Sequence, residues 1–408
     1  MVDSGTFPNP RSPSKLMSIS KPRVLLGPMF TDPAESVSSV NRIIVAGLSQ
    51  RYEFIFSRIN RTHGGTRQAM ITCWNCFYAF LEATHWLWNL LHRRPHIAHY
   101  AVSSGWAMEK SLLLLMLARW SGAKAIGHLH SGGFVHHWQH LPGWRRALAQ
   151  RQMLKLDGFI VLSGWWRGQM ANNVGIPKEN LWVVNNPIEP AFEKQALSFP
   201  IEREKTTILS LGTLGRDKGV FELVEACGIL HRMGRHFHLM LVGPEREPGI
   251  KAEVERRIAD ESCSGVVSLR GAIFGADKTS LFRDSSIFVL PSYYENFPLV
   301  VLESAAAGLA IVTTPVGAIP EFFKQDASAV FVPVKDAAAL AAALEHLLLH
   351  PAETHKLGQA ARTVFQKHLQ RDMIFSSLDN AYTTILAQSA TPNIAGSKSP
   401  TPTNPTIQ

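Results

Sequence analysis

Short β-prone apolar runs alternate with longer helical patterns along most of this chain. Strands separated by helices pair in parallel through right-handed crossovers, and eleven strands are too many for one sensible sheet. The alternation therefore predicts an α/β fold of two doubly wound, Rossmann-like domains. The expected strands are Arg23–Leu26, Glu53–Ser57, His96–Val102, Ala125–His130, Gly158–Leu162, Thr207–Leu211, His238–Val242, Val266–Leu269, Ile287–Leu290, Ala310–Thr313 and Val330–Val332.

The alternation lapses across residues 186–199, where prolines gather. We expect an N-terminal domain at residues 21–188 and a C-terminal domain at 189–388. The last helix of the second domain is a candidate for packing back on the first domain. Residues 1–20 and 389–408 are rich in Ser, Pro, Thr and Asn, and this composition predicts disordered tails.

Composition narrows the class of protein. Of the 408 residues, 46% are hydrophobic and 18% charged, which excludes a disordered chain. Four cysteines are too few for a disulfide scaffold, and the start lacks a basic segment followed by an apolar run. These features predict a cytoplasmic protein.

One apolar stretch, Ile71–His92, invites comparison with a membrane span, but polar residues interrupt it before about 20 apolar residues accumulate. As a helix, it places one apolar stripe at i, i+3 and i+4 spacing, which we expect to pack on a sheet. The stripe consists of Trp74, Phe77, Tyr78, Leu81, His85 and Trp88.

Charge is distributed unevenly. Residues 1–199 contain 21 basic and 10 acidic side chains, a net charge of +11, whereas residues 200–408 contain 20 and 22, a net charge of −2. The first half is therefore expected to meet an anionic partner, such as nucleic acid, a membrane leaflet or a phosphate-bearing substrate. A basic surface without a partner is the alternative.

The sharpest motif follows the strand Ile287–Leu290, where a polar loop leads into a helix beginning at Pro298. The free N–H groups of Leu299 and Val300 face the carboxyl edge of the sheet and suit a phosphate. Glu295 precedes Pro298 and Glu303 follows it, five residues or about 7.5 Å along the helix axis from Pro298. A solvated loop charge and a surface helix charge are the alternative reading.

A second strand-to-helix junction follows Thr207–Leu211, with Gly212 in the turn and Arg216 and Lys218 at its mouth. Two cations beside backbone N–H groups can neutralise a diphosphate. The pattern is neither a Walker sequence nor G-x-G-x-x-G, so NTP hydrolysis and dinucleotide redox chemistry lose their main support.

Taken together, these segments resemble the retaining nucleotide-sugar glycosyltransferases of family 4 (glycosyl transferases group 1), which have the two-domain GT-B fold with an interdomain cleft. The matching segments are Gly212–Gly219, Leu241–Pro244, Leu269–Gly271, Phe288–Ser292, Glu295–Glu303 and Thr314–Glu321 in the second half, and Pro95–His99, His128–His130, Val161–Ser163 and Val183–Ile188 in the first.

The resemblance implies a role for each matched residue. Lys218 and Arg216 would hold the donor diphosphate, Glu303 the ribose and Glu295 the transferred sugar, while the turn at Arg270 and Gly271 would meet the base. The remaining implied donor contacts are Gly212, Gly243, Asn296, Phe297, Pro298, Leu299 and Val300.

The family often places a histidine near the cleft, and His130 matches it, so Glu295, His130 and Lys218 are the expected catalytic residues. An imidazole satisfied by the Ser131–Gly133 turn is the alternative for His130. Two features depart from the family: Thr213 stands where an arginine is common, and Thr31–Val40 lacks a Gly-Gly loop.

No Asp-x-Asp pair or Cys/His quartet suits a metal-bound nucleotide, so the sequence predicts neither a metal nor a cofactor. The resemblance implies hexose transfer, with retention, from a nucleoside diphosphate sugar to a lipid-linked or polysaccharide acceptor in surface or exported polysaccharide biosynthesis. A GT-B nucleotide-sugar epimerase and a non-catalytic sugar-nucleotide binder are the alternatives. A nucleic-acid-binding module lacks any supporting motif.

The net charge of the first half also suggests peripheral contact with the anionic inner face of the cell membrane. The residues expected at that surface are Arg93, Arg94, Arg145, Arg146, Arg151, Lys155, Trp86, Trp138 and Trp144.

Overall fold

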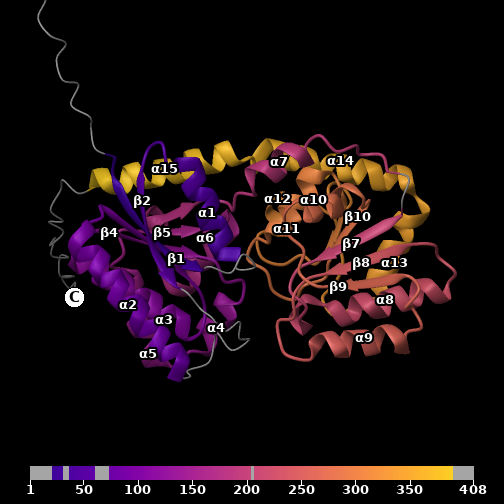
Figure 1. Ribbon diagram of the computed structural model, residues 1–408, viewed down its shortest axis with the longest axis horizontal. Helices are drawn as coiled ribbons and strands as arrows, with labels where there is room; N and C mark the ends of the chain where they lie inside the picture. The colour runs from indigo at the N-terminus through magenta and orange to yellow at the C-terminus, as the bar shows by residue number, and fades with distance from the viewer. Residues whose placement is uncertain (1–20, 31–35, 60–72, 204–205, 389–408) are drawn as a thin grey trace, which may run out of the picture.

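A computed structural model describes residues 21–30, 36–59, 73–203 and 206–388, and the two expected tails lie outside these residues. The chain forms an N-terminal and a C-terminal lobe, which lie side by side in Figure 1, and each is built on a six-stranded sheet. All the strand pairs are parallel. Two doubly wound α/β units are thus confirmed.

Every expected strand is present within one to four residues, and four match without any shift. The N-terminal sheet contains β1 (Arg23–Phe30), β2 (Glu53–Ile59), β3 (Ile97–Val102), β4 (Lys124–Leu129), β5 (Gly158–Val161) and β6 (Leu181–Val183). The C-terminal sheet contains β7 (Thr207–Leu211), β8 (His238–Val242), β9 (Val267–Arg270), β10 (Ile287–Leu290), β11 (Ala310–Thr313) and β12 (Val330–Phe331). Strand β6 was not expected, because three residues at a sheet edge leave too short a pattern.

The order of the strands fixes where each sheet can bind a ligand. The N-terminal order is β2-β1-β3-β4-β5-β6 and the C-terminal order is β12-β11-β10-β7-β8-β9. The direction of winding therefore reverses between β1 and β3, and again between β7 and β10. In open parallel sheets, ligands bind at the carboxyl ends of the strands beside such a reversal. The loops after β7 and β10 carry the two sequence motifs.

Helices cover both faces of each sheet (Figure 1). In the first half they are α1 (Ser36–Leu48), α2 (Cys73–Arg93), α3 (Trp106–Trp120), α4 (Phe134–His140), α5 (Gly143–Met153) and α6 (Gly164–Gln169). In the second half they are α7 (Pro190–Ala196), α8 (Val220–Arg232), α9 (Ile250–Asp260), α10 (Gly275–Arg283), α11 (Leu299–Ala307), α12 (Ile319–Phe322), α13 (Ala337–Leu349), α14 (Pro351–His368) and α15 (Arg371–Ala387). Short turns are η1 (Met170–Val174), η2 (Lys178–Asn180) and η3 (Arg216–Lys218).

Helix α15 comes last in the described chain but packs on the N-terminal lobe. Its Tyr382 is fully buried, with the hydroxyl 2.5 Å from His99 Nδ1 on β3. The Tyr52 hydroxyl donates to Asp379 Oδ1 at 2.8 Å, and Arg51 pairs with the same carboxylate. Burial raises the pKa of Tyr52 above its ordinary value, and so does its hydrogen bond to Asp379. The Tyr52 hydroxyl therefore stays protonated, and its hydrogen bond to Asp379 helps to fix the position of α15 on the N-terminal lobe.

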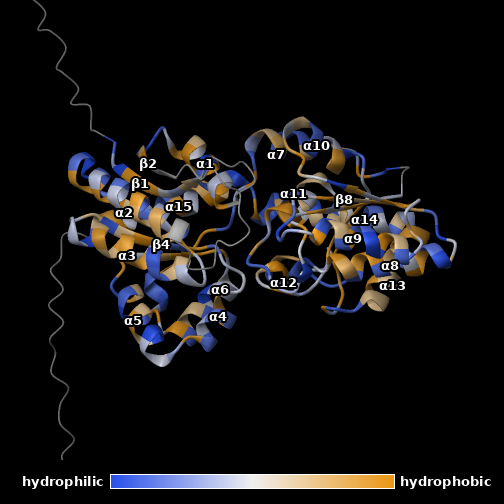
Figure 2. Cartoon of the chain, turned by 60° about the horizontal axis from the view of Figure 1, so that its bottom comes forward, coloured by the Kyte–Doolittle hydropathy of each residue, from blue (hydrophilic) through white to orange (hydrophobic). Residues whose placement is uncertain are grey.

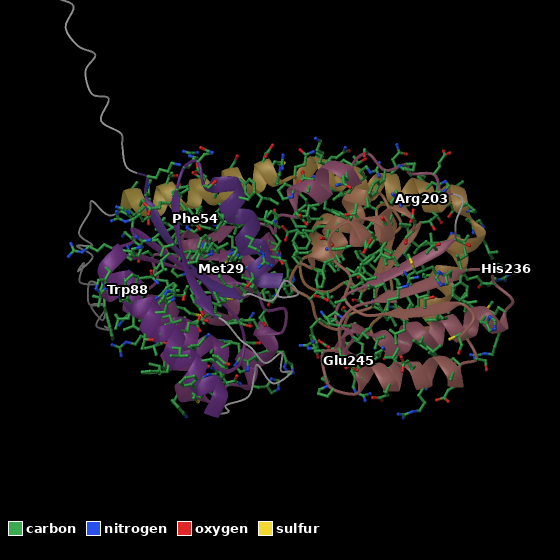
Figure 3. The ribbon with its side chains drawn as sticks, viewed as in Figure 1. Met29, Phe54, Trp88, Arg203, His236 and Glu245 are labelled. Atoms are coloured by element: carbon green, nitrogen blue, oxygen red, sulfur yellow. The ribbon has the colours of Figure 1, made fainter. Side chains whose placement is uncertain are left out.

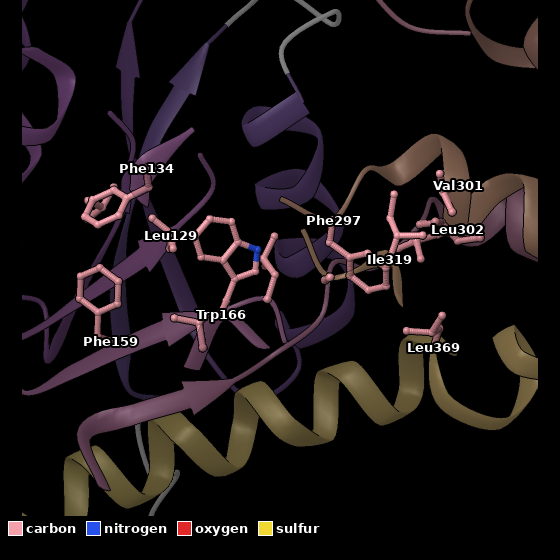
Figure 4. Close-up of a cluster of buried hydrophobic side chains, with 14 of the residues drawn as sticks. Leu129, Phe134, Phe159, Trp166, Phe297, Val301, Leu302, Ile319 and Leu369 are labelled. Carbon is pink, nitrogen blue, oxygen red and sulfur yellow. The ribbon is translucent and has the colours of Figure 1, made fainter. Parts of the chain in front are cut away.

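One hydrophobic cluster is continuous across the lobes, and Figure 4 shows part of it. Phe159 and Trp166 contribute from the N-terminal side, and Phe297, Ile319 and Leu369 from the C-terminal side. Burying each of these side chains contributes about 1.5–3 kcal/mol relative to exposure, so the cluster favours contact between the lobes.

The expected orientation of α2 is wrong. Phe77, Leu81 and Trp88 are between 44% and 50% exposed, whereas Trp86 is fully buried on the opposite side and its indole N–H donates to Leu114 O at 2.9 Å. Glu82, also buried, pairs with Lys110 on α3. Apolar residues occur on both sides of this helix, so periodicity could not identify the buried side.

Within the described residues, no helix is both long and apolar enough to cross a membrane.

The two tryptophans test this orientation. Trp86→Ala should lower the free energy of unfolding by about 3–5 kcal/mol, because it opens a cavity in the core. Trp88→Ala, its matched control, should change that free energy by less than about 0.5 kcal/mol. Urea unfolding followed by circular dichroism measures both, and the opposite ranking would show that α2 is rotated.

Candidate active site

The loops after β7 and β10 meet at the reversal point of the C-terminal sheet. Lys218 Nζ donates to Glu295 Oε1 at 2.6 Å, and the Tyr293 amide donates to Asp217 O at 2.8 Å. Gly219, with a φ of 68°, makes the approach feasible, since a Cβ there would lie 2.2 Å from Pro291 O. Lys218 and Glu295 remain 21% and 11% exposed, so solvent reaches the pair. The structure thus brings together two residues expected to be catalytic.

Helix α11 points its N-terminus at this junction. Pro298 is its N-cap, and Leu299 and Val300 supply N–H groups that have no acceptor within the helix. At the other end, the guanidinium groups of Arg203 and Arg362 donate to Ala307 O at 2.6 and 2.9 Å. These cations stabilise the negative end of the helix dipole, while no acidic residue occupies its first turn. The partial positive charge at the N-terminus stays available to an anion.

Glu303 lies deeper along α11 and is 4% exposed. Lys278 of α10 donates to its Oε1 at 2.6 Å, while Oε2 is buried without a partner. Burial raises the pKa of Glu303, and Lys278 acts in the opposite direction. An orphaned carboxylate oxygen beside the sheet edge is a suitable acceptor for a sugar hydroxyl.

The turns after β7, β8 and β9 pack closely together. A Cβ on Gly243, whose φ is 156°, would lie 1.7 Å from Gly212 O, so a side chain cannot occupy that position. The Gly243 amide donates to Arg270 O at 3.1 Å. Gly271 follows Arg270, which is exposed at the outer edge of the sheet. The backbones of Gly212, Gly243 and Arg270, three of the expected donor contacts, therefore lie against one another at the carboxyl ends of β7, β8 and β9.

Arg216 does not join Lys218 and Glu295. Its guanidinium lies against both carboxylate oxygens of Glu253 on α9 and over the ring of Phe221. Contact with a diphosphate would require it to leave this ion pair.

Two residues expected at the donor site contact the other lobe. Asn296 Nδ2 donates to Leu129 O at 3.0 Å, and Asn296 O accepts from the Trp166 indole at 3.3 Å. Phe297 O accepts from Asn186 Nδ2 at 3.0 Å. Asn296 and Phe297 are 5% and 2% exposed, so in this structure they join the lobes.

His130 approaches the junction from the N-terminal lobe, directly after β4. Two residues later, Gly132 lies so close to the loop after β10 that a Cβ would be 2.4 Å from the Glu295 carbonyl carbon. The turn after β4 is thus pressed against the turn that carries Glu295. His130 Nε2 is buried and has no hydrogen-bond partner.

A line of buried histidines runs inward from His130. The ring centroids of His130 and His128 are 4.0 Å apart. His128 Nδ1 is 3.1 Å from His99 Nε2, and His99 Nδ1 in turn lies within hydrogen-bond distance of the Tyr382 hydroxyl. Burial lowers the pKa of His130 to about 4 and that of His99 to about 3, and it holds the pKa of His128 well below its ordinary value. The imidazoles are therefore neutral near pH 7.

Two family models match the chain in succession. The model for Glycosyltransferase Family 4 matches residues 52–192, and the model for Glycosyl transferases group 1 matches residues 192–364. The chain belongs to the GT-B glycosyltransferases of this family.

Curated relatives in the same group include the amylovoran biosynthesis glycosyltransferase AmsK of Erwinia amylovora, 29% identical over 57% of this chain and 57% of AmsK. Glycogen synthase of Mycobacterium tuberculosis is 25% identical over 66% of this chain and 64% of that enzyme. The chain thus spans between half and two thirds of the length of these relatives.

Solved GT-B structures share the fold. A glycosyltransferase from Rickettsia africae has a TM-score of 0.72 at 18% identity, covering 90% of this chain and 100% of that one. Anabaena HepE in complex with UDP has a TM-score of 0.67 at 13% identity, with the same coverage.

Sequence reasoning assigned no role to Lys278, His99 or Glu321 in this GT-B site and its surroundings, although His99 and Glu321 end two of the matching segments. Lys278 lies on α10, which carries no recognisable motif, and only the packing of α10 against α11 brings it to Glu303. Glu321, known only as part of a matching segment, accepts from the Gly164 and Trp165 amides of α6 in the other lobe at 3.0 and 2.7 Å. Over the described part of the chain, no group of His, Cys, Asp or Glu has the arrangement of a metal site.

The buried histidines predict acid sensitivity of this GT-B fold. In the unfolded chain their pKa values return to about 6.5, so between pH 6.5 and about 4 these imidazoles take up protons mainly in the unfolded state. The free energy of unfolding should therefore fall as the pH falls through this window.

His128→Asn should reduce that slope by as much as about 1.4 kcal/mol per pH unit, the contribution of one proton. Urea unfolding at several pH values measures it, with exposed His236→Asn as the matched control. Equal slopes in both variants would mean that His128 titrates normally in the folded protein.

Proposed function

We propose that this protein transfers a hexose from a nucleoside diphosphate sugar to a glycan or lipid-linked acceptor, with retention of the anomeric configuration. The observation that carries the proposal is the Lys218–Glu295 pair at the reversal between β7 and β10, with the N-terminus of α11 beside it. This arrangement offers a cation and free backbone N–H groups to a diphosphate, next to a carboxylate suited to sugar hydroxyls.

Catalysis would depend on stabilising the charge that develops on the departing nucleoside diphosphate. The first amides of α11 are fixed by the fold before substrate binds, and the Lys218 ammonium, already at the junction, would exchange one partner for another. A phosphate oxygen would replace Glu295 as the partner of Lys218, and the released carboxylate would orient the sugar. Glu303, through its unpartnered Oε2, would hold the ribose.

The acceptor would enter from the side of the N-terminal lobe. If Glu295 orients the sugar and forms no covalent bond with it, retention favours attack on the face that the diphosphate leaves, through an oxocarbenium-like state in which a diphosphate oxygen takes the acceptor proton. His130, neutral and with a buried unpartnered nitrogen, would hydrogen-bond the sugar or phosphate. Holding both substrates in one geometry supplies part of the rate enhancement.

The relatives support a role in surface or exported polysaccharide synthesis. Besides the amylovoran enzyme, they include a putative colanic acid glycosyltransferase of Escherichia coli, 26% identical over 45% of this chain and 46% of that protein. Structures of HepE with UDP and with UDP-glucose make a uridine nucleotide the first donor to test.

Thermal shift with UDP-, GDP- and ADP-glucose identifies the donor, because a ligand that binds only the folded state raises its melting temperature. With that donor, Lys218→Ala should lower kcat/KM about a hundredfold, the usual effect of losing one charge-stabilising donor. Released nucleoside diphosphate measures the rate.

Lys251→Ala, on the exposed surface of α9, is the matched control and should keep full activity. Unchanged kcat/KM in the Lys218→Ala variant would contradict the proposal. Product analysis without acceptor separates the alternatives, since an epimerase would change the free sugar nucleotide and a simple binder would leave it intact.

A further inference from the structure

Large apolar side chains are exposed together on three helices of the N-terminal lobe. Helix α3 contacts both α2 and α5, so the three form one surface, as Figures 1 and 2 show. Figure 3 labels Trp88 at the outer edge of this lobe. Six side chains on this surface are between 40% and 79% exposed: Leu87, Trp88, Leu91, Trp120, Trp144 and Leu148.

Apolar and basic side chains share the same stripe along α5. Trp144, Leu148 and Arg151 follow one another at i, i+4 and i+7, Lys155 stands in the turn just after the helix, and all four are exposed. Trp144 thus lies at the start of the helix, Leu148 at its middle, and the two cations near or just beyond its end. A stripe of this kind suits the boundary between lipid headgroups and acyl chains.

A hollow of about 470 Å³ lies between α3 and α5, next to the place where the two helices touch. Trp120 and Leu148 supply apolar walls, while Arg119, Arg151 and Lys155 supply positive charge. A phosphate with an adjoining apolar chain matches this lining.

The acidic residues in this region are already neutralised. Residues 73–157 contain nine basic but only three acidic side chains. Glu82 pairs with Lys110, Glu109 with Arg145, and Asp157 with Arg119 and Lys124. Ion pairs within the described chain leave five cations without an acidic partner: Arg93, Arg94, Arg146, Arg151 and Lys155. The surface therefore complements a negatively charged plane.

We propose that the α2–α3–α5 face docks on an anionic phospholipid bilayer, with Trp120 and Trp144 at headgroup level and a lipid phosphate in the α3–α5 hollow. The membrane surface expected from sequence included Trp86 and Trp138, but both are buried, and Arg145 is paired. Exposed Trp88 and Trp120 take the place of the buried tryptophans.

Docking would also bring the interlobe junction near the lipid. The chain runs from His130 through α4 directly into α5, so only thirteen positions separate that histidine from Trp144. A lipid-linked acceptor held at the bilayer surface would then approach the interlobe junction from the side of the N-terminal lobe. This step rests on the proposed function, whereas bilayer binding itself does not.

Vesicle co-sedimentation of the full chain tests the proposal. The protein should bind phosphatidylcholine–phosphatidylglycerol vesicles far better than phosphatidylcholine alone, and high salt should weaken the binding. Arg151→Gln with Lys155→Gln should weaken it about thirtyfold, at about 1 kcal/mol per cation. Trp120→Ser with Trp144→Ser should also weaken it and reduce the vesicle-induced blue shift of tryptophan emission, leaving the part due to Trp88.

Two control variants come from exposed sites of the C-terminal lobe: Lys251→Gln with Arg256→Gln for charge, and Phe274→Ser for an apolar residue. Both should bind vesicles as the unaltered protein does. All variants should keep the donor-induced thermal shift, so loss of vesicle binding is distinguishable from loss of the donor site.

Absence of binding to anionic vesicles at low salt would overturn the proposal, as would face variants that bind like the controls. Sedimentation velocity adds a further test. If the double tryptophan substitution dissociates a dimer while vesicle binding persists, the face joins two copies of the chain and the proposal is wrong.

Discussion

The turn between β10 and α11, residues 291–298, is the segment on which the remaining arrangement depends. Its Glu295 carboxylate accepts from Lys218, its Tyr293 amide meets the loop after β7, and Asn296 bonds across to Leu129. One short segment therefore joins two neighbouring strand ends and also holds the second lobe. Displacing this turn would separate the charged pair and break the interlobe contacts together, which couples the geometry of the site to the relative position of the lobes.

Local patterns predicted every strand except the short edge strand β6, but they did not predict the orientation of α2. A buried parallel strand such as Ile287–Leu290 is apolar on both faces, so a short continuous run marks it whichever way it points. Helix α2 carries Trp86 and Trp88 on different sides, and contacts with other elements, such as Leu114 of α3 and Tyr100 of β3, accompany the burial of Trp86. That information lies in tertiary packing and is absent from the spacing of residues along one helix.

The same distinction holds within the candidate site. Lys218 and Glu295 follow neighbouring strands, so the topology alone predicts their meeting. Arg216 is only two residues from Lys218, yet it turns to Glu253, whose position on α9 no local motif announces. Lys278 reaches Glu303 from another helix. Pairings between a motif and a residue outside it are set by the packing of helices, which periodicity does not encode.

The return of α15 to the first sheet means that the backbone passes between the lobes twice, once between β6 and α7 and once between α14 and α15. Two bodies tethered at two points retain one easy rotation, about the line through those points. A rotation about this line would alter the separation of His130 and Glu295 while both chain crossings stayed in place.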